Sequence, residues 1–368
     1  MPGSSKQAIY NFILGDIIGF GNGKMECNNG LQFIEDNYKD FVNVGSEYAN
    51  ELTFDFIFQG GFSKYPLPKH RPSYHTLLML ATCRALINGT EYKDEYLTLV
   101  NEPKKMTDFS TKHGATKTTI KSLKRLLKGD EVNVLPESDD DESSPVIRSV
   151  IIGRKFYLHD QYTDLVRECI KCVIITHPNN MCILSSVMGA SFCAFAKRGI
   201  EPHLWLKGFY LLLDENDIVK RELGNVREDL LANYDSEKRK FIEIISKYYE
   251  DRFDDKGKFR DNDLMKYPSE RMLFYSHYEN MATEFYPGKT SIVCLLMAYD
   301  CLLMSNGSFD KVVLYSMVHS GNSSGTGALC AFYHGLVWGQ DDISRAMVLR
   351  IDENVINEST ELINQIKI

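Results

Sequence analysis

The feature that most constrains the fold of this chain is a series of apolar segments with helical spacing, separated by short polar or glycine-containing junctions. Apolar residues recur at every third or fourth position in these segments, and several segments are apolar nearly all round, as is typical of central helices. No run alternates polar and apolar residues between hairpin turns. The sequence therefore predicts an all-α fold. The clearest segments are 73–89, 164–177, 180–199, 290–307 and 327–339.

The ends of these segments carry helix start and stop signals. Ser73 or Thr76 is a candidate N-terminal cap for the helix within 73–89, and Gly89 follows its last apolar residue. Gly199 follows two basic residues at the end of 180–199, and 290–307 closes on Ser-Asn-Gly. Glycine after a helix adopts the left-handed conformation readily, so these positions are predicted helix C-termini.

Length and composition favour one large domain. The chain has 368 residues, 43% of them hydrophobic and 25% charged, and no compositional break divides it. We therefore predict a single domain over 1–368, with an acidic, proline-bounded surface loop at 134–145. Calcium binding by the acids at 139–142 is an alternative, but they lack the spaced oxygen ligands of a calcium loop.

Charge and targeting signals limit the partners that we expect. A net charge of −8 argues against nucleic acid and against anionic membranes. The basic segment 111–129 is the exception, and we interpret it as a solvated helix face. No signal peptide precedes the first helix, and the apolar run 181–196 is short for a membrane span. The nine cysteines are scattered, with one lone pair at Cys169 and Cys172, so we expect reduced thiols in a soluble, intracellular and most simply cytoplasmic protein.

Four junctions hold more glycine and small polar residues than a helical core needs. They are 14–26, 71–82, 176–182 and 320–327. Glycine lets the backbone approach a ligand closely, and a helix N-terminus can hold an anion. The alternative is that these residues only satisfy the helix ends.

Taken together, the junctions resemble motifs of the ADP-ribosylglycohydrolases, an all-α family that removes ADP-ribose from modified proteins. The likeness is greatest to the animal ADP-ribosylarginine hydrolases and to an inactive-looking cardiac relative. Seven blocks match in the family's order. They are GDIIGFGNGKME (15–26), RPSYHTLLMLATCRALING (71–89), KHGATKTT (112–119), SSPVIRSVIIG (143–153), THPNNMCILSSVMGASFCAFA (176–196), GKTSIVCLLMAYDCLL (288–303) and HSGNSSGTGALCAFYHGLVWG (319–339).

The resemblance implies a single large orthogonal helical bundle of the ADP-ribosylglycohydrolase type and, in active members, two magnesium ions held by carboxylates. Two dications need hard oxygen ligands and several negative charges nearby. The two acids of the family's S-D-D-T motif fall on Tyr74 and His75, and those of its G-D-S-D motif fall on Asn322 and Ser324. We therefore expect no cofactor here. A zinc site of His75, His319 and a cysteine is an alternative, but no ordered spacing supports it.

The rest of the site that the resemblance implies is partly kept. Glu26 matches a glutamate that active relatives use near the substrate and is the candidate acid or base, with Asp16 and Asp300 in support. The H-D-A-P block has lost its acid and proline, now Val293 and Leu295. The other candidate residues of the ligand cleft are Gly23, Ser73, Thr76, Gly114, Ser144, His177, His319, Gly321, Ser323 and Thr326.

Three hypotheses follow. The first is a pseudoenzyme with a degenerate magnesium site that binds ADP-ribose or an ADP-ribosylated protein. The second is an active hydrolase that removes ADP-ribose from arginine or another acceptor with a rearranged site built on Glu26, Asp16 and Asp300. The third is a structural or interaction protein whose cleft is filled by side chains such as Tyr74 and Met25.

Overall fold

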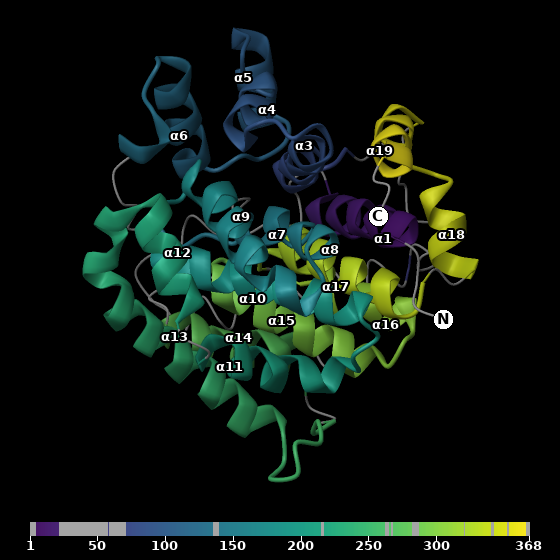
Figure 1. The fold of residues 1–368 in the computed structure, drawn as a ribbon. Coiled ribbons are helices and arrows are strands. Elements are labelled where there is room, and N and C mark those ends of the chain that lie inside the picture. Colours follow the sequence, from purple (N-terminus) through teal and green to yellow (C-terminus); the bar gives the residue numbers. More distant parts are fainter. Residues whose placement is uncertain are drawn as a thin grey trace, which may run out of the picture. The chain divides into compact units, whose positions relative to one another are not determined.

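The chain is built of helices joined by turns, which confirms the all-α prediction (Figure 1). The computed structural model describes residues 5–21, 58, 71–134, 140–214, 217–261, 265, 268–281, 287–319, 321–339, 342–351 and 353–365. In this part of the chain the β-structure consists of one isolated antiparallel bridge between Phe253 and Phe259.

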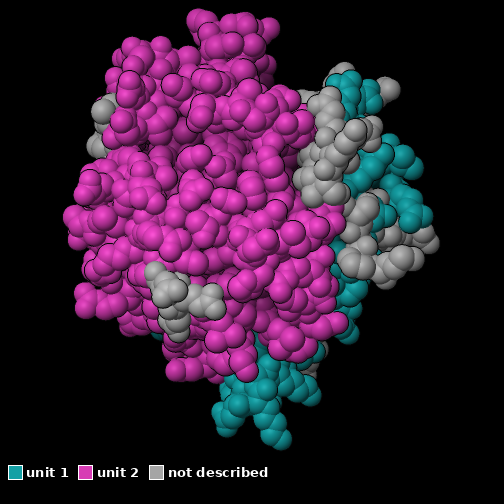
Figure 2. All heavy atoms as spheres, viewed as in Figure 1, with its two compact units in different colours: residues 1–73, 252–361 teal, residues 74–251, 362–368 magenta. Residues whose placement is uncertain are grey.

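The helices fall into two compact units, which Figure 2 colours separately. Unit 1 comprises 1–73 and 252–361, and unit 2 comprises 74–251 and 362–368. The last residue of α13 belongs to unit 1, and the last turn of α19 belongs to unit 2. The single domain predicted for 1–368 stays a prediction. The helices of unit 1 are α1 (Ser5–Phe20), α14 (Pro268–Met281), α15 (Ser291–Ser305), α16 (Phe309–Ser316), α17 (Ser323–Val337), α18 (Asp342–Val348) and α19 (Glu353–Gln365).

The helices of unit 2 follow one another without interruption from the start of the unit. They are α3 (Tyr74–Asn88), α4 (Tyr92–Thr98), α5 (Pro103–Thr111), α6 (Lys117–Leu127), α7 (Ser144–Ser149), α8 (Ile152–Lys155), α9 (Tyr162–Ile174), α10 (Asn180–Lys197), α11 (Trp205–Asp214), α12 (Ile218–Val226) and α13 (Leu231–Arg252). Short 3₁₀ turns occur at Val132–Val134, His159–Gln161, Pro202–Leu204 and Glu228–Leu230.

At the centre of unit 1, α1 packs antiparallel against α17 through positions that have no room for a side chain. A Cβ atom at Gly15 would lie 2.3 Å from the carbonyl oxygen of Gly327. A Cβ atom at Gly19 would lie 2.1 Å from the carbonyl oxygen of Ser323. The Ser323 hydroxyl donates to the carbonyl of Gly19 at 2.7 Å. Glycine at these positions is therefore what allows the two backbones to touch.

The centre of unit 2 is α10, which packs against α7, α8, α9 and α11. Every residue from Asn180 to Ala196 is buried. Among the described helices α10 is long and apolar enough to cross a membrane, but 94% of it is buried inside the protein. This is the environment of a core helix, as the sequence predicts.

Capping side chains set the helix boundaries. Asn179 accepts hydrogen bonds from the first turn of α10, and Thr116 accepts one from the first turn of α6. Gly89 and Gly199 have positive φ angles of 66° and 72°, which confirms them as helix stops. The helix predicted from residue 327 begins earlier, at Ser323, because the small residues 323–327 form its first turn.

The predicted acidic loop at 134–145 lies partly at 135–139, outside the described residues. Its C-terminal part is not exposed. Asp140 and Asp141 are half-buried, and Glu142, Ser143 and Ser144 are buried. This end of the segment contributes to the core of unit 2, because the buried helix α7 follows directly.

Candidate functional site

The predicted site residues are divided between the two units. Gly23 and Glu26 lie outside the described residues, as does Met25. Unit 1 holds Asp16, Ser73, Asp300, His319, Gly321, Asn322, Ser323, Ser324 and Thr326. Unit 2 holds Tyr74, His75, Thr76, Gly114, Ser144 and His177.

In unit 1, Asn322 is the N-terminal cap of α17. Its Oδ1 atom accepts a hydrogen bond from the Gly325 amide at 3.0 Å. Its Nδ2 atom donates to the carbonyl oxygen of Gly288 at 2.8 Å. The Asn322 side chain is 6% exposed. The oxygen and the nitrogen of the Asn322 amide therefore both make structural hydrogen bonds.

An aspartate at position 322 could make only one of these two contacts. Its carboxylate could still cap α17, since a carboxylate accepts hydrogen bonds from backbone amides. It could not donate to the carbonyl of Gly288, and its second oxygen would face that carbonyl at the distance of the present 2.8 Å bond. The junction therefore favours asparagine, whose side chain both accepts from Gly325 and donates to Gly288.

The segments that carry Gly288 and Asn322 are packed too tightly to leave space between them. The amide of Asn322 donates to the carbonyl of Pro287 at 2.9 Å. A Cβ atom at Gly321 would lie 2.1 Å from the same carbonyl oxygen. Gly288 has a φ angle of +79°, and a Cβ atom there would meet the Thr326 methyl at 3.0 Å.

His319 is buried in the same junction and serves as a structural histidine. The Gly321 amide donates to its Nδ1 atom at 3.0 Å, so Nδ1 is an acceptor and the ring proton of the neutral form lies on Nε2. Nε2 lies 3.1 Å from the Ser316 carbonyl and 2.8 Å from the Thr326 hydroxyl. Burial and the nearby Arg271 charge lower the pKa of His319 to about 3, so the imidazole stays neutral.

Ser324 lies in the first turn of α17. It is buried, and its hydroxyl lies 3.5 Å from the Asn322 Oδ1 atom. Thr326 donates to backbone carbonyls within the junction at 2.8 Å. The junction around Asn322 is thus a hydrogen-bonded group of neutral side chains.

Asp16 connects the first motif to the second. It is fully buried, and its two carboxylate oxygens accept from the Ser73 amide at 2.9 Å and the Ser73 hydroxyl at 2.5 Å. Ser73 immediately precedes α3. The carboxylate therefore fixes the chain at the start of the second motif.

Asp300 lies within a buried ion pair on α15. Its Oδ1 atom accepts from Arg252 at 2.7 Å and its Oδ2 atom from the Tyr275 hydroxyl at 2.6 Å. Arg252 also stacks on the Phe259 ring, with 4.6 Å between the guanidinium carbon and the ring centroid. Both oxygens of Asp300 are therefore used in hydrogen bonds within unit 1.

In unit 2, Tyr74 and His75 are the first two residues of α3. Tyr74 and His75 are 6% and 3% exposed, and their rings lie 4.2 Å apart. The amide of Tyr74 donates to the His113 carbonyl at 2.8 Å, and its ring meets Phe109 edge-on. Thr76 is fully buried, and Gly114 has a φ angle of +70°. Neither Tyr74 nor His75 supplies a carboxylate.

A buried polar network in unit 2 brings three of the motifs together. His177 Nε2 donates to Glu142 Oε2 at 2.9 Å, and the Thr116 hydroxyl donates to the same oxygen at 2.6 Å. Burial by itself would raise the pKa of Glu142. The attraction of His177 and these hydrogen bonds outweigh that effect and hold the pKa below its usual value. The network therefore contains an ionised, buried carboxylate.

Arg148 extends this network. Its guanidinium donates to the Ser144 hydroxyl at 3.1 Å, to the Thr176 hydroxyl at 2.7 Å and to two backbone carbonyls of α9. Thr176 in turn lies 2.8 Å from Nδ1 of His177. Arg148 is fully buried. Ser144 and His177 are thus linked through Arg148 and Thr176.

Sequence reasoning missed Glu142, Arg148, Thr116 and Thr176. Arg148 falls on the arginine of the fourth block, which was an available signal. Glu142 is the last acid of a run whose composition is typical of a solvated loop, so the sequence predicts that it is exposed. Its burial depends on tertiary contacts with His177.

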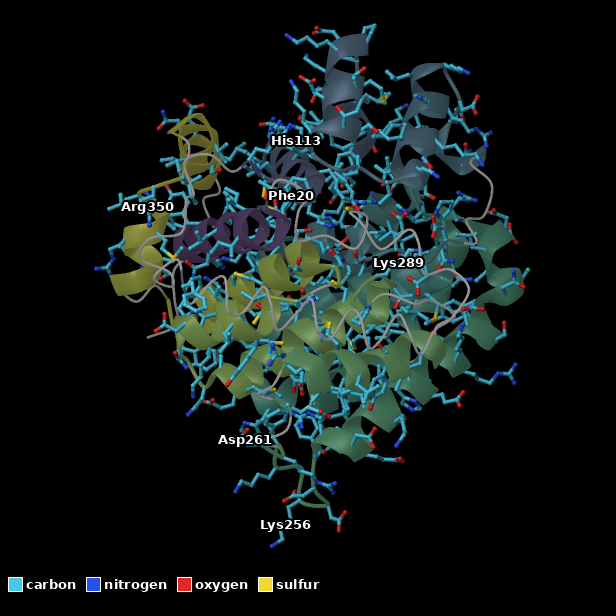
Figure 3. The ribbon with its side chains drawn as sticks, turned by 180° about the vertical axis from the view of Figure 1, so that it is seen from behind. Phe20, His113, Lys256, Asp261, Lys289 and Arg350 are labelled. Carbon is cyan, nitrogen blue, oxygen red and sulfur yellow. The ribbon has the colours of Figure 1, made fainter. Side chains whose placement is uncertain are left out.

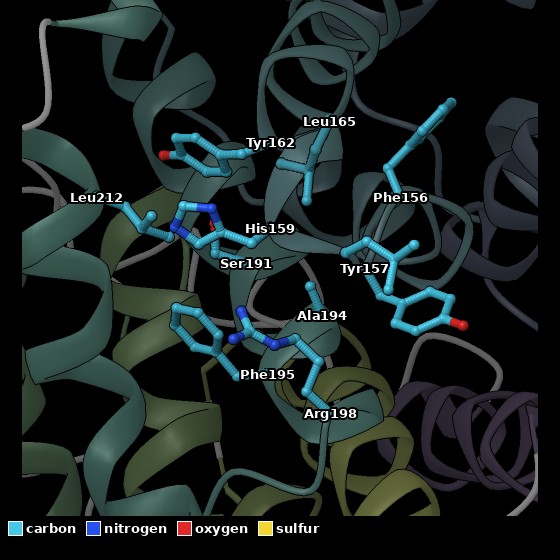
Figure 4. A pocket seen from close by; sticks show the side chains of 11 residues that line it. Phe156, Tyr157, His159, Tyr162, Leu165, Ser191, Ala194, Phe195, Arg198 and Leu212 are labelled. Carbon is cyan, nitrogen blue, oxygen red and sulfur yellow. The ribbon is translucent and has the colours of Figure 1, made fainter.

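Figure 4 shows a small pocket in unit 2, and none of the candidate residues lines it. Its volume is about 20 Å³, which corresponds to roughly one water molecule. Phe195, Tyr162 and Arg198 are among the side chains that line it. The pocket is too small to hold a nucleotide.

Comparison with known proteins supports the resemblance. A protein of Acanthamoeba polyphaga mimivirus with the provisional name ADP-ribosyl glycohydrolase is 28% identical over 372 residues, which cover 97% of this chain and 68% of that protein. The ADP-ribosylhydrolase ARH1 of Dictyostelium discoideum is 23% identical over 223 residues, covering 58% of this chain and 57% of that protein. The chain thus aligns with less than two thirds of the Dictyostelium protein.

The fold has a solved counterpart. A chain of an ADP-ribosylglycohydrolase-related protein complex superposes with a TM-score of 0.52 at 12% identity, covering 98% of both chains. At this identity the similarity shows the fold alone. The profile of the ADP-ribosylglycohydrolase family matches residues 12–367, and the chain therefore belongs to the ADP-ribosylglycohydrolase family.

Proposed function

We propose that this protein is a non-hydrolytic member of its family, which binds an ADP-ribosyl group without the two-magnesium chemistry of active relatives. The observation that carries the proposal is the double use of the Asn322 amide, as the cap of α17 and as the donor to Gly288.

The donor set does not fit magnesium. Magnesium prefers carboxylate and water oxygens in an octahedron, and two such ions need several negative charges. At the four family positions this chain has a phenol, an imidazole, an amide and a hydroxyl. The Asn322 Oδ1 atom already accepts from Gly325, and its amide protons are directed at a carbonyl. We derive no catalytic step through these positions.

The other buried acids among the candidates, Asp16 and Asp300, already use their carboxylate oxygens in hydrogen bonds within the protein. Both oxygens of Asp16 accept from Ser73, and both oxygens of Asp300 accept from Arg252 and Tyr275. An active hydrolase with a rearranged site would therefore depend on Glu26. One carboxylate supplies acid or base help without the electrostatic stabilisation that is usually the larger contribution.

The test is an assay for release of ADP-ribose from an arginine-modified protein, with and without magnesium, using an active family member as the positive control. We expect no release above background. Release that disappears in Glu26→Gln would contradict the proposal and support the second hypothesis. Calorimetry with magnesium alone should show no tight binding, and with ADP-ribose alone it should show binding.

A second candidate function, interaction without any nucleotide, is favoured by one observation in unit 2. His177 is a candidate cleft residue, yet its Nε2 proton is used by the buried Glu142 carboxylate. A ligand phosphate would meet that negative charge rather than a free donor. If calorimetry detects no heat with ADP-ribose at millimolar concentration while the protein is folded, this second function replaces the first.

A further inference from the structure

Four lysines with helical spacing follow one face of α6, the helix that Figure 1 labels. The lysine stripe consists of Lys117, Lys121, Lys124 and Lys128, all of which are exposed. Their spacing of four, three and four residues places them on one side of a helix. The opposite side of α6 is buried through Thr119, Leu123 and Leu126.

The charge of this stripe is not neutralised in the described part of the chain. Arg125 on the same helix pairs with Asp130 at 2.6 Å, and Lys112 pairs with Asp108 at 3.0 Å. The four lysines of the stripe make no such contact with any described residue. Residues 103–129 have eight basic side chains and one acidic one, a formal charge of +7 in a chain whose net charge is −8.

Stabilisation of α6 by charge at its C-terminal end accounts for only two of the four lysines. Lys124 and Lys128 lie at the C-terminal end, where positive charge interacts favourably with the helix dipole. Lys117 is the first residue of α6, where the dipole disfavours a cation, and no acid lies in the first turn. Each neighbouring pair of lysines in the stripe is also a repulsive pair on the helix surface.

We propose that the lysine stripe is a docking surface for an acidic segment of a partner protein. The stripe is roughly 16 Å long, because a helix rises about 1.5 Å per residue. That length spans about five residues of an extended chain. Lysine ammonium groups are compact charges that pair with single carboxylates without a fixed geometry. The proposal does not depend on the function proposed above.

Other polyanions fit the stripe less well. Single-stranded nucleic acid is usually bound by aromatic side chains that stack on the bases, and α6 has no aromatic residue. A membrane-bound amphipathic helix inserts its apolar face into the lipid, but the apolar side chains Leu123 and Leu126 of α6 are buried in the protein.

The experiment measures fluorescence anisotropy of a labelled nine-residue peptide, in which Glu alternates with Gly, on titration with the full chain. Wild type is compared with the quadruple variant Lys117→Gln, Lys121→Gln, Lys124→Gln and Lys128→Gln. We expect the variant to bind about tenfold more weakly at low salt, and wild-type binding to weaken as salt is added. Glutamine is a good helix former, so the melting temperature should be maintained.

The matched control carries the same change of charge at four other exposed lysines, Lys207, Lys256, Lys258 and Lys311. Lys256, which Figure 3 labels, lies in the loop after α13. We expect this control to bind the peptide as wild type does. Equal loss in both variants, or no peptide binding by wild type, would overturn the proposal. So would tighter binding of wild type to a labelled oligothymidylate of the same charge, which would assign the stripe to nucleic acid.

Discussion

The two units each contain a buried polar cluster, and the two clusters differ in charge. Around Asn322 in unit 1, the cap of α17 is an amide, the nearby imidazole is neutral and the hydroxyls donate to backbone carbonyls. Around Glu142 in unit 2, an ionised carboxylate and a buried guanidinium are linked through Thr176 and His177. The junction around Asn322 is therefore neutral, whereas the polar network of unit 2 contains a buried carboxylate.

This difference has consequences for stability as well as function. Neutral hydrogen bonds add little net free energy each but are costly to leave unmade when buried. A buried charge is costlier still if it loses its partners. We therefore expect substitutions in the unit 2 network to be more damaging than substitutions around Asn322.

The largest effect is expected for Arg148→Met. This change removes a fully buried guanidinium and leaves the Ser144 and Thr176 hydroxyls and two carbonyls of α9 without its hydrogen bonds. We expect a loss of about 3–5 kcal/mol in the free energy of unfolding, measured by urea denaturation. Arg125→Met is the control, because that side chain is 36% exposed and its ion pair among the described residues is with Asp130. A loss no greater than in this control would mean that the unit 2 network is not structural.

Next in size is Asn322→Asp, which places a carboxylate at the N-terminal cap of α17. We expect a loss of about 1–3 kcal/mol, because the donor to Gly288 disappears and a carboxylate faces its carbonyl. Asn322→Ser is the matched control, because it keeps a capping oxygen without adding charge. Denaturation with and without magnesium measures both effects. Restored stability of the aspartate variant on adding magnesium would show that the junction still accepts the ion.

The smallest effect at neutral pH is a difference in pH dependence between the two clusters, which develops only as the pH is lowered. The folded-state pKa of His319 is about 3, below that of an unfolded histidine. Below about pH 6.5 the unfolded chain therefore binds a proton that the folded chain does not. Stability should fall by about 1.4 kcal/mol per pH unit from this group between pH 6 and pH 4. His319→Gln should flatten this part of a stability profile measured by urea denaturation.

Glu142 provides the contrast in the same profile. Its folded-state pKa is lowered, so its contribution is fully present above the unfolded value of about 4.5 and is lost only as the pH falls below it. Glu142→Gln should therefore change the profile at more acid pH than His319→Gln does. If the two variants flattened the same pH range, the assignment of charge to the two clusters would be wrong.

The helices and their ends were predictable because the signals are local. The apolar periodicity of 180–199 identifies the core helix α10, and Gly89 and Gly199 lie where helices end. The boundary error at α17 has a local cause too. Small residues such as Ser323 and Gly325 have weak helix propensity, and only the cap from Asn322 and the contact with α1 make them the first turn.

The sequence by itself determined the family and the all-α class, since both follow from the identity and order of the residues. Only the tertiary structure decided which partners the polar residues of these motifs have. That Asn322 bonds to Gly288, that Asp300 pairs with Arg252 and that Glu142 is buried against His177 are contacts between residues 34, 48 and 35 positions apart. Local patterns cannot specify such contacts, because burial and the choice of partner for a polar group depend on which helices the fold brings together.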